Sequence, residues 1–206
     1  MLADARLYLV TPVLEPARLR ALLDGGVDLV QLRMKAAPDA DVLREAGWMR
    51  AVCAEAGVPF LLNDRPDLAV QAGADGVHVG QDDVAAADAR ATVGADRLVG
   101  LSTHSPAQLA AASPQADYVA VGPVWETPTK PGRAAAGLEY VAHAAAQAGA
   151  RPWFAIGGID TDNIRAVVEA GARRVVVVRA LVEAADPAQA AATLKAALLE
   201  APVGIA

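Results

Sequence analysis

The residues with the clearest chemical potential are two aspartates that follow neighbouring apolar runs. Asp64 comes after Phe60–Leu62, and Asp83 comes after Val77–Val79. Two carboxylates at adjacent strand ends suit a hard cation such as Mg²⁺, which takes oxygen ligands and keeps several waters. Cationic side chains follow other apolar runs, namely Arg33, Lys35, Arg65 and Lys130. A magnesium ion with lysine and arginine is suited to neutralising a departing diphosphate.

A structural interpretation of Asp64 fits the same spacing. Asp64 can cap the helix that follows it and pair with Arg65 or Arg33, and spacing alone favours neither interpretation. His78 alternates with valines and is interpreted as an interior histidine with satisfied hydrogen bonds. A Ser102–His104 nucleophilic pair is disfavoured, because residues i and i+2 need not meet and no orienting acid is evident.

These side chains meet only if the elements that carry them end at one place. Short apolar runs alternate with Ala-rich helical stretches, and near-continuous apolar runs are typical of parallel strands covered on both faces. We expect strands at 6–11, 28–33, 59–63, 75–79, 97–101, 117–121, 152–156 and 174–178. We expect helices at 15–25, 38–57, 66–73, 84–93, 105–112, 137–149, 160–170 and 187–199.

Eight such units predict an α/β fold, a single-domain (β/α)8 TIM barrel over residues 1–206, with a doubly wound open sheet as the alternative. In a barrel all strand ends share one rim, where such folds carry their active sites. On that rim the Gly157–Gly158 turn after the seventh run predicts a second anion site, because glycines expose backbone N–H groups. Two anion sites suit an enzyme that joins two phosphorylated molecules.

The longest stretch without a regular pattern is Trp125–Ala136. A long loop after a barrel strand is typically a lid or a binding loop, and we favour this interpretation over an exposed connector. Trp125 either covers an aromatic ring of a ligand or packs under the loop.

Composition limits the classes of partner. The formal net charge of -6 argues against binding of nucleic acid or acidic membranes, and no apolar run is long enough to span a bilayer. The single cysteine, Cys53, excludes an internal disulfide and is interpreted as a buried filler. The first residues show no signal-peptide pattern. We therefore expect a cytoplasmic protein with small-molecule substrates.

Taken together and in order, the motifs resemble the thiamine-phosphate synthase family over nearly the whole chain. They are 7-LYLVT-11, 30-VQLRMK-35, 62-LNDR-65, 76-GVHVGQDD-83, 102-STHS-105, 122-GPV-124, 127-TPTKPG-132 and 156-IGGI-159. The resemblance implies a transferase of thiamine biosynthesis. Its members condense 4-amino-2-methyl-5-hydroxymethylpyrimidine diphosphate with a thiazole phosphate, and release diphosphate in a Mg²⁺-assisted dissociative substitution.

The resemblance also implies residue roles. The magnesium ligands would be Asp64 and Asp83. The pyrimidine diphosphate would contact Gln31, Leu32, Arg33, Met34, Lys35, Asn63, Ser102 and Lys130. The thiazole phosphate would contact Thr127, Pro128, Thr129, Gly158, Val178 and Arg179. Among these, Lys130, Ser102 and Arg33 would be catalytic through leaving-group stabilisation, and no side chain need act as a nucleophile.

Two positions depart from the family pattern, and two other functions stay open. Arg179 stands where a serine is usual, so it either adds a phosphate ligand or turns outward. Thr11–Pro12 replaces the more common Thr-Asp. A related thiazole tautomerase and a non-catalytic phosphate-binding barrel are the alternatives, and the Asp pair and the Thr-x-Thr-Lys segment favour the synthase. The family also suggests a homodimer.

Overall fold

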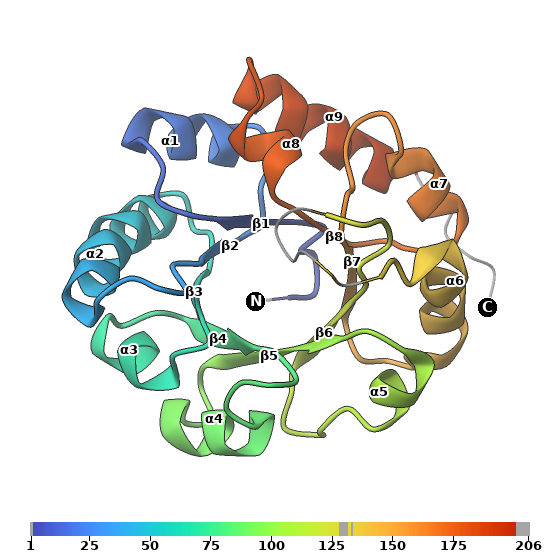
Figure 1. Ribbon diagram of the computed structural model, residues 1–206. Coiled ribbons are helices and arrows are strands. Elements are labelled where there is room, and N and C mark those ends of the chain that lie inside the picture. Colours follow the sequence, from blue (N-terminus) through green and yellow to red (C-terminus); the bar gives the residue numbers. More distant parts are fainter. Residues whose placement is uncertain (1, 128–131, 133, 201–206) are drawn as a thin grey trace.

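Parallel strands and helices alternate around one closed barrel in the computed structural model, which describes residues 2–127, 132 and 134–200 (Figure 1). Each strand pairs with the next along the chain, and β1 closes the ring by pairing with β8. The strands are β1 (Leu7–Thr11), β2 (Leu29–Leu32), β3 (Phe60–Asn63), β4 (Gly76–Val79), β5 (Leu98–Thr103), β6 (Tyr118–Val121), β7 (Trp153–Ile156) and β8 (Val175–Val177). The predicted TIM barrel is confirmed, and the open sheet is excluded.

Helices surround the barrel, as Figure 1 shows. They are α1 (Pro16–Asp24), α2 (Asp39–Glu55), α3 (Pro66–Gln71), α4 (Ala86–Val93), α5 (Pro106–Ala110), α6 (Gly137–Gln147), α7 (Ile164–Glu169), α8 (Arg179–Val182) and α9 (Pro187–Leu199). Several begin with proline in the first turn, where its missing N–H costs nothing. No helix of the described chain combines the length and apolarity that a membrane span needs.

Most predicted strands begin one residue earlier than the observed ones, and α7 begins four residues later than predicted. Three further differences have a clear structural reason. β5 continues to Thr103 because its last two residues pair with Ala120 and Val121 of β6. The predicted strand 174–178 ends at Val177, because Val178 already precedes the first turn of α8. The four-residue helix α8 was not predicted, since so short a segment carries no helical periodicity.

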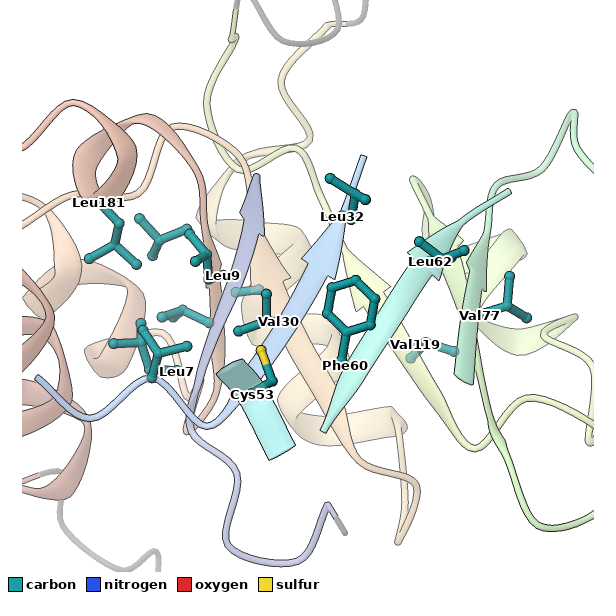
Figure 2. Close-up of a cluster of buried hydrophobic side chains, with 14 of the residues drawn as sticks. Leu7, Leu9, Val30, Leu32, Cys53, Phe60, Leu62, Val77, Val119 and Leu181 are labelled. Carbon is teal, nitrogen blue, oxygen red and sulfur yellow. The ribbon is translucent and has the colours of Figure 1, made fainter. Parts of the chain in front are cut away.

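The strands are buried on both faces, which explains their apolar sequences. Alternate side chains point outward into the layer of helices, where they form one large hydrophobic cluster. Figure 2 shows part of this outer cluster, with Leu7 and Leu9 of β1, Val30 of β2 and Phe60 of β3 drawn near Cys53 of α2. Cys53 is fully buried there, as expected of a filler residue.

The intervening side chains point into the barrel and form a second, smaller cluster. Three aromatic rings dominate it: Tyr8, Tyr118 and Phe154 meet edge to face, with ring centroids 5.4–5.9 Å apart. Leu2 and Ala5, in the segment before β1, belong to the same cluster, and Figure 1 shows this segment within the ring of strands. The barrel is therefore a packed core up to the level of its carboxyl-end rim.

Aspartates stabilise the opposite end, where the strands begin. Asp28 Oδ2 accepts hydrogen bonds from the N–H of Arg6 and Leu7, at 2.7 and 2.9 Å. Asp75 Oδ2 accepts one from Phe60 at 2.8 Å, and Asp117 Oδ2 accepts one from Val99 at 2.7 Å. Each of these aspartates immediately precedes an even-numbered strand and holds the start of the preceding odd-numbered one.

Candidate active site

Two adjoining pockets open at the carboxyl-end rim. The first, which we call the acidic pocket, has a volume of about 60 Å³ and is lined by Tyr8, Val10, Gln31, Arg33, Lys35, Asn63, Asp64, His78, Gly80, Asp83, Ser102, Ala120, Ile156, Val176 and Val178. The second, the glycine pocket, has about 350 Å³ and is lined by Ser102, His104, Gly122, Pro123, Thr127, Ile156, Gly157, Gly158, Ile159, Asp160, Val176, Val178, Arg179, Ala180, Glu183 and Ala184. The shared wall includes Ser102, so ligands in the two pockets would lie side by side.

In the acidic pocket, Lys35 lies between the two aspartates. Its Nζ is 3.0 Å from Asp64 Oδ2 and 3.7 Å from Asp83 Oδ1. Asp83 is also held by its own loop, since its Oδ2 accepts a 2.9 Å hydrogen bond from the N–H of Gly80. The spacing of strands β3 and β4 therefore brings both carboxylates to one cation.

Asp64 is electrostatically unfavourable in this position. Burial, and then the neighbouring Asp83 carboxylate, raise the pKa of Asp64 above its ordinary value, and the Lys35 ammonium only partly opposes this. Asp64 is also the one non-glycine residue of the described chain with a positive φ, 63°. Strained backbone and a disfavoured charge together are typical of a residue retained for function.

The structural alternative for Asp64 is not what the structure shows. Asp64 pairs with Lys35 rather than with Arg65 or Arg33, and no side-chain hydrogen bond caps α3. Arg65 instead forms ion pairs with Asp39 and Asp67, at 2.6 and 2.8 Å, at the first turns of α2 and α3. Arg65 does not line the acidic pocket and is not one of its cations.

The predicted residues of the segment 31–35 point to two different places, the acidic pocket and the outer hydrophobic cluster. Gln31, Arg33 and Lys35 line the acidic pocket, together with Asn63. Leu32 points the other way and is buried in the outer cluster, as Figure 2 shows. Met34 is partly buried against that same cluster. Leu32 and Met34 therefore line neither pocket, because alternate residues of a strand face opposite sides.

The glycine pocket is built around the turn after β7. Gly158 has a φ of +68°, and a Cβ there would lie 2.9 Å from the Cβ of Trp125, so glycine is required. Asn163 Nδ2 holds the turn by donating a 2.8 Å hydrogen bond to the Gly158 carbonyl. Between described residues, no hydrogen bond uses the N–H of Gly157 or Gly158. These amides are available to an anion in the pocket.

Val178 and Arg179 also line the glycine pocket, at the start of α8. Arg179 is exposed, and no residue of the described chain forms an ion pair with it. The guanidinium therefore lies at the pocket and in solvent at once, which leaves both interpretations of this position open.

Only part of the predicted loop site is described. Thr127 lines the glycine pocket, whereas Pro128, Thr129 and Lys130 lie outside the described residues. Trp125 packs against the outer hydrophobic cluster, in agreement with the packing interpretation.

Ser102 forms a hydrogen bond with His78 and not with His104, which is closer in sequence. His78 Nε2 lies 2.9 Å from Ser102 Oγ, and His78 Nδ1 lies 3.0 Å from the hydroxyl of Tyr118. His104 Nδ1 instead lies 2.7 Å from the carbonyl oxygen of Gly122. The expectation that His78 is a satisfied interior histidine is confirmed, and no Ser102–His104 pair forms.

Sequence reasoning missed several pocket-lining residues, most of them apolar. Tyr8, Val10, Ala120, Ile156 and Val176 line the acidic pocket, and none carries a charge that would single it out. Alternation along each strand is the signal that identifies these residues, because every second side chain of a strand points into the barrel. Val10 and Gln31, for example, are register partners, and both point inward. Counting alternate positions back from each rim residue would have identified this set.

The fold and the site together define a TIM-barrel enzyme with two adjoining pockets at its carboxyl-end rim, one of which carries a carboxylate pair. Comparison with known proteins makes this class more specific. A family model described as thiamine monophosphate synthase matches residues 7–181. The chain belongs to this family.

Individual relatives agree over almost the full length. The chain is 52% identical over 207 residues to a thiamine-phosphate synthase of Acidothermus cellulolyticus, covering 97% of this chain and 98% of the relative. It is 52% identical over 198 residues to that of Thermus thermophilus, covering 92% and 95%. The solved structure of a thiamine phosphate pyrophosphorylase from Pyrococcus furiosus superposes with a TM-score of 0.86 at 29% identity, covering 96% of each chain.

Proposed function

We infer that the chain is a thiamine-phosphate synthase, a transferase of thiamine biosynthesis. It joins 4-amino-2-methyl-5-hydroxymethylpyrimidine diphosphate to a thiazole phosphate and releases diphosphate. The observation that carries this inference is the pair of adjoining pockets, which share a wall at Ser102. Two phosphorylated substrates held there side by side meet at that wall, and this converts a bimolecular encounter into a positioned reaction.

The acidic pocket fits a magnesium ion. Asp64 and Asp83 already face one cation, the Lys35 ammonium, and burial followed by the neighbouring Asp83 carboxylate raises the pKa of Asp64 despite that cation. The described residues contain no cluster of three or more His, Cys, Asp or Glu side chains arranged for a metal. Two carboxylates suit Mg²⁺, which takes its remaining oxygens from water and substrate phosphates. When bound there, the metal would neutralise charge on the diphosphate.

We assign the remaining work of the acidic pocket to positioning and leaving-group stabilisation. Arg33 and Lys35 place cations beside the diphosphate, and Gln31, Asn63 and Ser102 supply polar contacts to the same substrate. The carbon–oxygen bond to diphosphate breaks first, with its electron pair leaving on the diphosphate. The thiazole nitrogen then forms the new bond to the pyrimidine methylene carbon. No protein nucleophile is involved, and Lys130 is proposed to assist the same departure.

We assign the thiazole phosphate to the glycine pocket. The N–H groups of Gly157 and Gly158 and the side chain of Thr127 support an anion site at the turn after β7. Arg179 lies at the same pocket, and we assign it to the phosphate as an added charged ligand in place of the usual serine. Pro128, Thr129 and Val178 complete the proposed contacts.

The test is product formation from the two substrates, with Mg²⁺ and then with excess EDTA. We expect thiamine phosphate only when the metal is present. Product that persists in EDTA would overturn the metal assignment while leaving the synthase intact. Folded protein that turns over neither substrate would favour the tautomerase or the non-catalytic barrel. A homodimer and a cytoplasmic location stay predictions, as does a single domain over residues 1–206.

A further inference from the structure

A chain of buried hydrogen bonds crosses the interior of the barrel. Gln31 Nε2 donates to the hydroxyl of Tyr8, and this hydroxyl lies 2.9 Å from that of Tyr118. The Tyr118 hydroxyl lies 3.0 Å from His78 Nδ1, and His78 Nε2 lies 2.9 Å from Ser102 Oγ. The chain thus joins side chains from five strands, and both of its ends, Gln31 and Ser102, line the acidic pocket.

The centre of the chain lies below the site. Tyr118 is completely buried and lines neither pocket, so it cannot touch a substrate held in either. The crossing depends on Gly100 of β5, which is the register partner of both His78 and Tyr118. A Cβ on Gly100 would lie 2.3 Å from the Tyr118 hydroxyl oxygen and 2.5 Å from His78 Nδ1. Glycine at this position leaves the space in which that hydrogen bond forms.

Each hydroxyl in the chain has one proton, so the hydrogen bonds along it depend on one another. Gln31 donates to Tyr8, whereas the Tyr8–Tyr118, Tyr118–His78 and His78–Ser102 hydrogen bonds can each be donated from either side. Burial raises the pKa of both tyrosines above the ordinary value, so both keep their protons at neutral pH.

The two ends of the chain are therefore coupled. The donor chosen in any one of these hydrogen bonds limits the donors available to its neighbours. The hydrogen-bonding state of Gln31 and that of Ser102 are thus set together.

We propose that Tyr118 is a positioning residue which, through Tyr8 and His78, holds the side chains of Gln31 and Ser102 in place for the pyrimidine diphosphate. An aminopyrimidine diphosphate offers these two groups a donor, its exocyclic amine, and acceptors in its ring nitrogens and diphosphate oxygens. Groups held in place in this way spare the substrate the cost of ordering them on binding. The proposal rests on the synthase function inferred above.

The test substitutes Tyr118→Phe, which removes the hydroxyl and keeps the ring that packs against Tyr8 and Phe154. We expect kcat/KM for the pyrimidine diphosphate to fall about 10-fold, the effect of losing one productive hydrogen bond. The KM for the thiazole phosphate should not change. The matched control is Tyr140→Phe, which removes another buried tyrosine hydroxyl, bonded at 2.8 Å to Thr103 outside both pockets. This control should lose stability alone.

A double-substitution cycle shows whether Tyr118 acts through Ser102. Tyr118→Phe combined with Ser102→Ala should lose less activity than the product of the two single losses, because both substitutions break the same chain of hydrogen bonds. Equal kinetic effects of Tyr118→Phe and Tyr140→Phe, or additive losses in the cycle, would overturn the proposal. If Tyr118→Phe does not fold, Tyr8→Phe breaks the same chain and takes its place. Absence of product from the unsubstituted protein would instead refute the synthase function.

Discussion

The two ends of the barrel use aspartate in opposite ways. Where the strands begin, Asp75 and Asp117 each accept a hydrogen bond from a backbone N–H group. No hydrogen bond between described residues joins either of them to a second carboxylate. Where the strands end, Asp64 and Asp83 face each other, and burial with mutual repulsion raises the pKa of Asp64. The same side chain thus stabilises the fold at one end and is electrostatically costly at the other.

This difference distinguishes aspartates that stabilise the fold from aspartates that serve the site. A carboxylate that accepts backbone hydrogen bonds stabilises its own charge and the start of a strand together. Two carboxylates that share one ammonium are incompletely compensated, and such a pair is retained where a further cation or an anionic ligand completes the charge balance.

The largest effect is expected for Asp83→Ala at the carboxyl end. Removing one of two carboxylates should lower magnesium-dependent turnover on the order of 100-fold or more, because the leaving diphosphate loses its charge compensation. Steady-state product formation against Mg²⁺ concentration measures this. The unfolding midpoint in urea should change little, because relief of the repulsion at Asp64 offsets the loss of the acceptor for the Gly80 N–H.

The control for this variant is Asp82→Ala, an exposed carboxylate one residue away that does not line the acidic pocket. It should retain full activity. Full activity in Asp83→Ala itself would refute the assignment of Asp83 to the metal.

The opposite pattern is expected for Asp75→Ala at the end where the strands begin. The N–H of Phe60 would lose its acceptor, which should cost about 1–3 kcal/mol of unfolding free energy. Urea denaturation measures this loss, and kcat should be unchanged at a temperature where the variant is folded. A fall in kcat with unchanged stability would contradict the division between the two ends.

The smallest effect is expected for Arg65→Gln, which lies at the carboxyl end but outside the pocket. The guanidinium lowers the pKa of Asp39 and Asp67, so its contribution exists above the ordinary carboxyl pKa and is lost as the pH falls through the lowered values. The variant should therefore show a lower Tm at pH 7, by less than Asp75→Ala, and no difference in strong acid. Thermal melts across pH test this. A large loss of turnover would contradict the placement of Arg65 outside the active site.

The sequence predicted the architecture because periodicity repeats. Apolar runs and Ala-rich stretches alternate often enough that an error in one unit leaves the others intact, and the rim follows from the shared direction of the strands. The helix α8 was not predicted, because four residues are too few to show helical periodicity. Asp64, Asp83 and Gln31 reach the acidic pocket as predicted, since strand ends and strand parity determine where they point.

Pairings between side chains were harder to predict. Ser102 has His104 two residues away, yet it bonds to His78, because the register of β4 and β5 sets Gly100 beside His78 and leaves Ser102 within reach above it. Lys35 lies between two carboxylates because a long flexible side chain follows local charge rather than strand direction. Such contacts depend on register and rotamer, which no local pattern encodes.

Because the Lys35 ammonium already lies between Asp64 and Asp83, a metal ion would have to compete with it for the two carboxylates. A magnesium ion bound as proposed would displace the ammonium, which would cancel part of its electrostatic gain and make binding of the bare ion weak. The displaced ammonium would stay beside the site, within reach of a bound diphosphate. Metal and pyrimidine diphosphate would then favour each other's binding, and full positive charge would surround the leaving group only with both present.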